Sequence, residues 1–239
     1  NDSVKNPIVF LPGYGGSYNH TAFIYNNKSI PDTQWSITPF ISIYDGLIKT
    51  LEKNGYQKGS NLFIYPYDWR KNADTTAENL KNYINENILT SGGSFVKVDL
   101  IGHSFGGIIA RTYTQNNPEK IGKLITVGSP HKGTTKTYKI WEGAEFPGLP
   151  HWQEILLRLY IQSNSGLFGS NVKTIHELSP SLLNTWPTFD FIKDSDGNIK
   201  PNGTLAWQNN FLPSLDGGLP NISDLFSTIS GNKGDSTTQ

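Results

Sequence analysis

The residues with the clearest chemical meaning lie over 102–106, which read Gly-His-Ser-Phe-Gly with Ser104 at the centre. The preceding segment 95–101 alternates and then turns apolar, as a strand does on entering a core, and 107–113 is apolar on one face, as a helix is. Because the flanking glycines lack a Cβ, strand and helix can approach closely around the turn and hold the serine hydroxyl clear of the sheet. A serine in this setting is typical of a nucleophile that accepts an acyl group.

A serine hydroxyl is a weak nucleophile by itself, so this chemistry needs partners. A histidine must take its proton, a carboxylate must orient the histidine, and backbone N–H groups must stabilise the oxyanion. The N–H of Phe105, directly after Ser104, is the expected first donor. The pattern therefore predicts a serine hydrolase or acyltransferase of the α/β-hydrolase fold, with Ser104 as nucleophile.

The elements that must position this serine follow a regular alternation along the chain. Apolar runs predict strands over 7–11, 61–65 and 121–127, and helical spacing predicts helices over 43–54 and 73–89. Strands that alternate with helices predict a mostly parallel sheet with helices on both faces. The loops at the carboxyl ends of such strands meet at one edge, where we expect the active site.

The alternation stops after the last of these strands. The following stretch is rich in Pro, Trp and Asn and contains two helical segments, over 152–161 and 172–178. We interpret it as a cap inserted between core strands, which covers an apolar site. The expected parts are a hydrolase core over 1–134, a cap over 135–220, and a returning core strand with a truncated tail over 221–239.

The amino-acid composition limits the classes of partner and cofactor that this protein could bind. The 239 residues carry 20 basic and 20 acidic side chains without a basic run, which argues against a nucleic-acid partner. Cysteine is absent, which excludes a disulfide, a thiolate nucleophile and a cysteine metal site, and we expect neither a metal nor a cofactor. No apolar run approaches the roughly 20 residues of a membrane span. A content of 12% aromatic and only 17% charged residues fits a protein that handles apolar ligands.

Several motifs together resemble the lecithin:cholesterol acyltransferase-like family. Residues 65–70, Tyr-Pro-Tyr-Asp-Trp-Arg, resemble the signature that discriminates this family. The serine pentapeptide, the first strand with its loop over 7–16, the segment 125–133 and the segment 175–183 are similar to other motifs of the family. The resemblance covers most of residues 7–185. It implies acyl-ester chemistry on lipids, as a lipase, phospholipase or O-acyltransferase, with transient contact to a membrane or lipid surface.

The resemblance also implies roles for single residues. Tyr14, in the loop after the first core strand, matches the family's second oxyanion donor. Asp68 and Arg70 are expected to pair and to brace the rim of the site. His103 is interpreted as a packing residue, and His131 falls in a loop that is structural in the family.

The acid and the histidine of the reaction are harder to place. In this fold they follow the serine along the chain, the acid first. His131, His151 and His176 all precede the returning strand, which we expect over 225–229, and Asp235 resembles the family's acid loop only faintly. His131 and Asp235 are therefore weak candidates. We expect the chain to end before the acid and the histidine, and to be nearly inactive by itself.

Two other interpretations stay open. One is a glycosyl-phosphatidylinositol deacylase, and the other is a non-catalytic binding protein on a hydrolase fold whose triad has decayed. The sequence does not determine the acyl chain, the head group, or whether water or an alcohol accepts the acyl group. Several Asn-x-Ser/Thr triplets and the absence of cysteine are compatible with export, and we expect a secreted or cell-surface protein.

Overall fold

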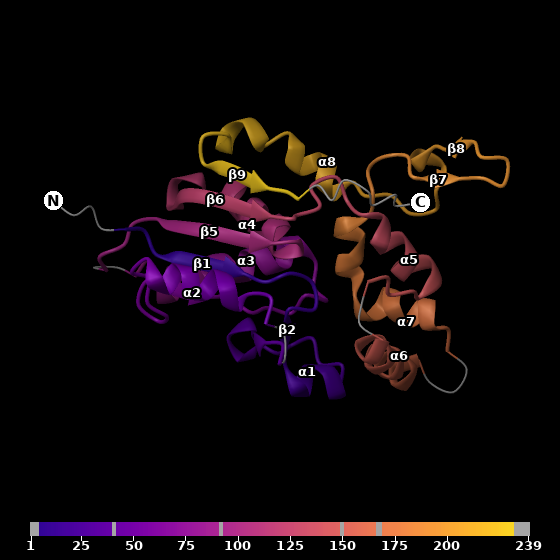
Figure 1. The fold of residues 1–239 in the computed structure, drawn as a ribbon, viewed down its shortest axis with the longest axis horizontal. Helices are drawn as coiled ribbons and strands as arrows, with labels where there is room; N and C mark the ends of the chain where they lie inside the picture. The colour runs from indigo at the N-terminus through magenta and orange to yellow at the C-terminus, as the bar shows by residue number, and fades with distance from the viewer. Residues whose placement is uncertain (1–4, 40–41, 91–92, 149–150, 166–168, 232–239) are drawn as a thin grey trace.

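The computed structural model describes residues 5–39, 42–90, 93–148, 151–165 and 169–231. In this part of the chain, parallel strands form a central sheet in the order β4-β1-β5-β6-β9 (Figure 1). The strands are β1 (Ile8–Leu11), β4 (Leu62–Ile64), β5 (Val98–His103), β6 (Ile121–Val127) and β9 (Phe226–Ile229). The parallel sheet predicted from the alternating pattern is confirmed.

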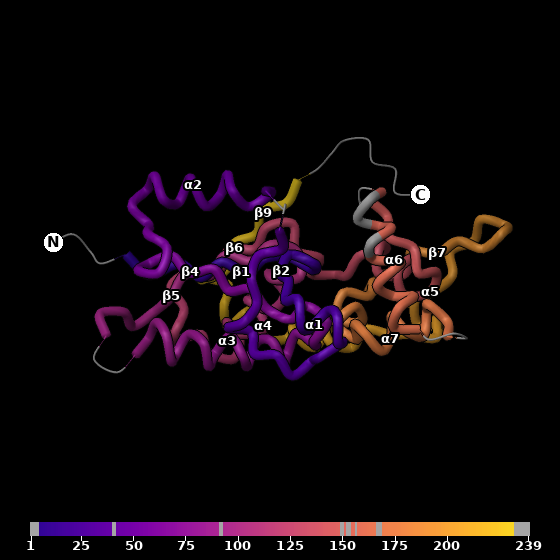
Figure 2. Tube along the Cα trace, turned by 90° about the horizontal axis from the view of Figure 1, so that it is seen from below, coloured from indigo at the N-terminus to yellow at the C-terminus, as the bar shows by residue number. Residues whose placement is uncertain are grey.

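Helices cover both faces of the sheet, as Figure 2 shows, with α2 above the strands and α3 and α4 below them. Alternate residues of β1 therefore face different helices. Phe10 packs in one apolar cluster with Ile48 of α2, whereas Val9 belongs to the larger cluster with Leu80 of α3 and Ile108 of α4. The three helices are α2 (Asp45–Lys53), α3 (Ala73–Asn87) and α4 (Phe105–Asn116).

Some boundaries differ from the sequence-based prediction. Strand β5 begins at Val98 rather than at residue 95 and extends to His103, because its last residues pair with both neighbours: Gly102 lies opposite Leu11, and His103 lies opposite Val127. The segment between β1 and α2 also contains short elements that no periodic pattern indicated. They are β2 (Ser17–Tyr18), α1 (His20–Ile24), the 3-10 turn η1 (Asp32–Gln34) and β3 (Ser36–Ile37).

A long insertion separates β6 from β9. Helices α5, α6 and α7 lie beyond the carboxyl ends of the strands (Figure 1), and Trp141, Leu178 and Trp186 form part of a separate apolar cluster there. The sequence predicted two helices in this region and missed α5 and α8. The chain then returns to the sheet, because Leu212 and Ile222 belong to the core cluster. The elements are α5 (Thr135–Gly143), α6 (His151–Ser165), α7 (Asn171–Leu178), η3 (Pro180–Thr185), β7 (Ile192–Lys193), β8 (Ile199–Lys200), η4 (Asn202–Thr204), α8 (Phe211–Asp216) and η5 (Leu219–Ile222).

No helix among the described residues is long and apolar enough to cross a membrane. The same residues contain no group of three or more His, Asp or Glu side chains that are placed to hold a metal ion.

The loop after β4 is held by a buried ion pair between Asp68 and Arg70. Both side chains are fully buried, and the carboxylate accepts hydrogen bonds from Nε at 2.7 Å and from a terminal guanidinium nitrogen at 2.8 Å. The same guanidinium group donates to the carbonyl oxygens of Ala22 and Asn27, both at 2.9 Å. The predicted pairing is confirmed, and it joins the loop after β4 to the segment around α1.

Removing this carboxylate charge should destabilise the fold strongly. In Asp68→Asn the guanidinium group of Arg70 would remain buried without its counter-ion, so we expect a loss of about 3–5 kcal/mol in the free energy of unfolding, measured by urea denaturation. The matched control is Glu78→Gln, which breaks an exposed ion pair with Lys81 (2.9 Å) and should change stability by less than about 1 kcal/mol. Equal, small effects of the two substitutions would contradict a structural role for the buried pair.

Candidate active site

Ser104 sits alone between the last residue of β5 and the first residue of α4. Its backbone has φ 51° and ψ −121°, and its N–H donates to the carbonyl oxygen of Val127 at 2.9 Å. A residue with a Cβ rarely adopts a positive φ, which costs on the order of 1–3 kcal/mol and persists only where the surroundings impose it. The predicted order of strand, sharp turn and helix is therefore found at this serine.

Close contacts between glycines leave room for this turn. A Cβ on Gly102 would collide with the backbone of Gly107, and a Cβ on Gly106 would collide with the carbonyl oxygens of Leu11 and Pro12. Strand β5, helix α4 and the end of β1 thus touch at positions where only glycine fits.

The loop after β1 lies directly against the serine. A Cβ on Gly13 would be 3.1 Å from the Cβ of Ser104. The N–H of Gly13 is engaged, since it donates to the Tyr44 hydroxyl at 2.9 Å. The next N–H, that of Tyr14, has no hydrogen-bond partner among the described residues. Phe105 is the first residue of α4, where backbone N–H groups lack carbonyl partners within the helix. The structure therefore brings the loop of Tyr14 and the N-terminus of α4 together at Ser104.

The histidine next to the serine is occupied by packing. Nδ1 of His103 lies 3.2 Å from the Tyr44 hydroxyl, and the two rings pack edge to face at 5.6 Å. Burial lowers the pKa of His103 below its ordinary value. This contact agrees with the interpretation of His103 as a packing residue.

His131 is turned into the protein at the end of β6. Its Nε2 lies 3.0 Å from the Thr126 hydroxyl, and its ring packs edge to face on Phe226. Burial, together with the nearby positive charge of Arg111, lowers the pKa of His131 to about 4. No histidine in the described part of the chain is hydrogen bonded to Ser104. Asp235 lies outside the described residues.

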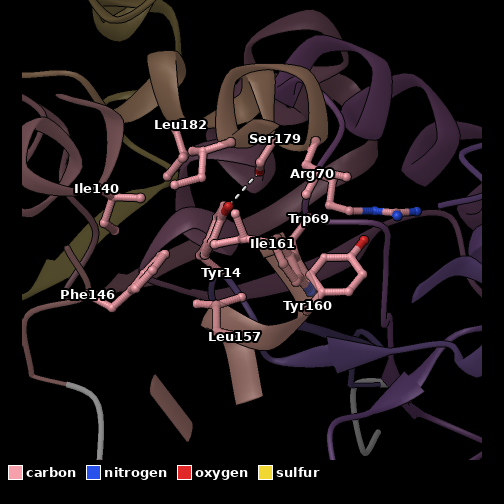
Figure 3. Close-up of a pocket in the computed structure, with 12 residues that line it drawn as sticks. Tyr14, Trp69, Arg70, Ile140, Phe146, Leu157, Tyr160, Ile161, Ser179 and Leu182 are labelled. Atoms are coloured by element: carbon pink, nitrogen blue, oxygen red, sulfur yellow. Dashed lines mark hydrogen bonds between the residues drawn. The ribbon is translucent and has the colours of Figure 1, made fainter. Parts of the chain in front are cut away.

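An apolar pocket of about 40 Å³ lies between the rim of the sheet and the cap helices (Figure 3). The ring of Tyr14 forms one wall, 4.4 Å from the ring of Trp69 and 6.3 Å from that of Phe105. Tyr14 thus lies between this pocket and Phe105, the residue that follows Ser104. The remaining lining residues are Arg70, Ile140, Phe146, Leu157, Tyr160, Ile161, Ile175, Leu178, Ser179 and Leu182.

Sequence reasoning missed two residues that contact the site. Tyr44, which holds Gly13 and His103, gave no motif signal. Ser179 lies within the segment 175–183, whose similarity to the family pointed to the region but not to a contact with Tyr14.

A parallel sheet with helices on both faces, and a serine on a strained turn between its central strand and the next helix, defines the α/β-hydrolase fold. The family model described as lecithin:cholesterol acyltransferase matches residues 33–202, and the chain belongs to this family.

Two curated relatives illustrate the similarity. The phospholipase A(1) LCAT3 of Arabidopsis thaliana is 33% identical over 96 residues, which is 38% of this chain and 21% of that protein. The phosphatidylcholine-sterol acyltransferase of Rattus norvegicus is 26% identical over 158 residues, which is 63% of this chain and 32% of that protein. The chain thus spans about a fifth to a third of the length of these relatives.

Among solved structures, phospholipase PlaB from Legionella pneumophila superposes with a TM-score of 0.50 and 12% sequence identity. The match covers 97% of this chain and 40% of that chain. It supports the shared fold.

The buried state of His131 predicts a pH dependence of stability. Its pKa rises from about 4 in the folded chain to the ordinary 6.5 on unfolding. Between these values the unfolded chain binds a proton that the folded chain does not, so stability falls as the pH is lowered from 6.5 to 4, by about 3 kcal/mol in total. Urea unfolding across this range should show the loss. His131→Gln should show a smaller loss, and identical pH profiles for the two proteins would refute the assignment.

Proposed function

We propose that this chain carries the nucleophile and oxyanion hole of a lipid-ester hydrolase or O-acyltransferase, which works through an acyl-serine intermediate. The observation that carries the proposal is the backbone of Ser104, held at a positive φ beside two backbone N–H groups that have no partner in the described part of the fold. Strain at a single polar residue is a frequent sign of a functional site.

The reaction follows from this geometry. Ser104 Oγ attacks the ester carbonyl, and the N–H groups of Tyr14 and Phe105 stabilise the oxyanion of the tetrahedral intermediate. Collapse of the intermediate releases the alcohol and leaves the acyl group on Ser104, from which water or an alcohol removes it. The described histidines contact other groups or are exposed, so none of them is assigned as the general base. The acid that would orient the base is likewise not assigned.

A lipid substrate is supported by the pocket and by the relatives. The pocket that Tyr14 borders is lined mainly by apolar and aromatic side chains, which suits an acyl chain. The two curated relatives are named for action on phospholipid esters, one as a phospholipase and one as an acyltransferase. No contact among the described residues favours the glycosyl-phosphatidylinositol deacylase or the decayed binding protein over this proposal.

The central test is Ser104→Ala in the natural full-length protein. Loss of the nucleophile should lower kcat/KM for a nitrophenyl ester by roughly 10⁴ to 10⁶ and abolish covalent labelling by a fluorophosphonate. Ser223→Ala removes a surface hydroxyl from the residue that follows η5. This variant is the matched control and should keep full activity. Activity of Ser104→Ala within tenfold of the parent would exclude this serine as the nucleophile, and a normally folded parent that is neither active nor labelled would favour the decayed binding protein.

The segment 135–220 is proposed to act as a cap that contacts the lipid surface. On α6, Ile155 and Leu159 are 45% and 57% exposed, and they lie one turn apart on the same side of the helix. The ring of Tyr160 in α6 packs against Phe23 of α1 at 5.1 Å, so α6 contacts the α1 segment of the hydrolase core. The side chains of Trp152 and Leu156, which also belong to α6, are not among those that the structure describes.

Polar substitutions on this surface should separate aggregated from soluble substrates. In the full-length protein, Ile155→Ser combined with Leu159→Ser should lower the rate on phosphatidylcholine vesicles several-fold, because less apolar area is available to the lipid surface, and should spare a soluble short-chain ester. Val96→Ser, at a more exposed apolar position before β5 and away from the cap, is the control. Equal losses on both substrates would mean that α6 acts only in folding.

A further inference from the structure

Tyr14 is 36% exposed as a residue, but its side chain ends in a row of hydroxyl groups, of which those of Ser179 and Ser181 are buried. Its hydroxyl lies 2.5 Å from Ser179 Oγ, which lies 3.1 Å from Ser181 Oγ. Ser181 Oγ in turn donates to the carbonyl oxygen of Trp69 at 2.6 Å. The row joins the loop after β1, the end of α7 and the loop after β4. None of these contacts belongs to the reaction described above.

The direction of the row follows from counting hydrogens. Each hydroxyl has a single proton to donate. Ser181 gives its proton to Trp69, so Ser179 must donate to Ser181, and the Tyr14 hydroxyl must donate to Ser179. Burial raises the pKa of Tyr14 well above its ordinary value, which keeps the phenol protonated as this role requires. Because hydrogen bonds in a chain polarise one another, Ser179 holds the Tyr14 ring in one position.

That position restricts the pocket. Figure 3 shows the Tyr14 ring among the lining residues with its hydroxyl directed at Ser179. With the ring in place the pocket measures about 40 Å³. A cavity of roughly 150 Å³ is needed to hold one benzene molecule, so the pocket in this state is too small for a long acyl chain. Because the Tyr14 ring forms a wall of the pocket, its displacement would enlarge the pocket, and it requires breaking the bond to Ser179.

We propose that the Tyr14 side chain is the gate of this apolar pocket and that Ser179 is its latch, so that the Tyr14–Ser179 hydrogen bond limits the length of acyl chain that enters. As a statement about the acyl site, it rests on the function proposed above. Tyr14 then couples the two halves of the site: the ring that an acyl chain displaces and the N–H that faces the oxyanion belong to one residue.

The test is binding of two eight-carbon probes, octanoate and 1-octanol, measured by isothermal titration calorimetry. Tyr14→Phe removes the hydroxyl and keeps the ring, and Ser179→Ala removes the acceptor. Each should tighten binding by about 2- to 12-fold, the factor that corresponds to the net 0.5–1.5 kcal/mol of one hydrogen bond. The double variant should match the single variants, because all three lack the same bond.

Controls separate the latch from general effects on folding. Tyr18→Phe removes a tyrosine hydroxyl that contacts His20 outside the pocket, and Ser214→Ala removes an exposed hydroxyl on α8; neither should change binding of the probes. Unchanged or weaker binding in both latch variants, or no binding of either probe to any protein, would overturn the proposal.

The outcome is distinct from that of the proposed reaction. The 1-octanol probe has no carboxylate and needs no oxyanion hole, and Ser104→Ala should leave its binding unchanged. If Tyr14→Phe and Ser179→Ala tighten 1-octanol binding while octanoate does not bind, the role of the Tyr14–Ser179 hydrogen bond is supported and the proposed acyl-ester site is contradicted. If Ser104 proves not to be the nucleophile, the response of 1-octanol to Tyr14→Phe still decides the role of the latch.

Discussion

The constraint on which the rest of this structure depends is the backbone of Ser104. A positive φ at a residue with a side chain costs on the order of 1–3 kcal/mol, and here the surrounding contacts impose it. Strand β5 is paired on both sides, helix α4 is buried along most of its length, and Gly102 meets Gly107 where the two elements cross. The core of the domain thus stabilises one strained residue at its edge.

Around this residue, polar contacts join loops that are far apart in the sequence. Asp68 and Arg70 connect the loop after β4 to the segment around α1, and the row of hydroxyls that begins at Tyr14 connects both sides of the site to the end of α7. Buried polar networks are costly when only part of their hydrogen bonds is made. Complete pairing in these two places therefore keeps the rim in one arrangement.

Three histidines of the described residues make contacts with groups other than Ser104. His103 packs with Tyr44, His131 contacts Thr126, and His176 stacks on Trp141 at 3.8 Å. Each ring thus has a contact partner other than Ser104. The described residues provide the strained turn at Ser104, the loop of Tyr14 and an apolar pocket, and no histidine among them is hydrogen bonded to Ser104.

The sequence by itself determined the sheet, the turn at Ser104 and the Asp68–Arg70 pair, because apolar periodicity, glycine spacing and neighbours two residues apart are local properties. It did not determine the short elements between β1 and α2 or helix α5, which have few residues and gain their stability from packing against distant segments. The bond between Tyr14 and Ser179 joins residues 165 positions apart. Only the tertiary structure could decide it, since a hydroxyl carries no information about its partner until the folded chain brings one within reach.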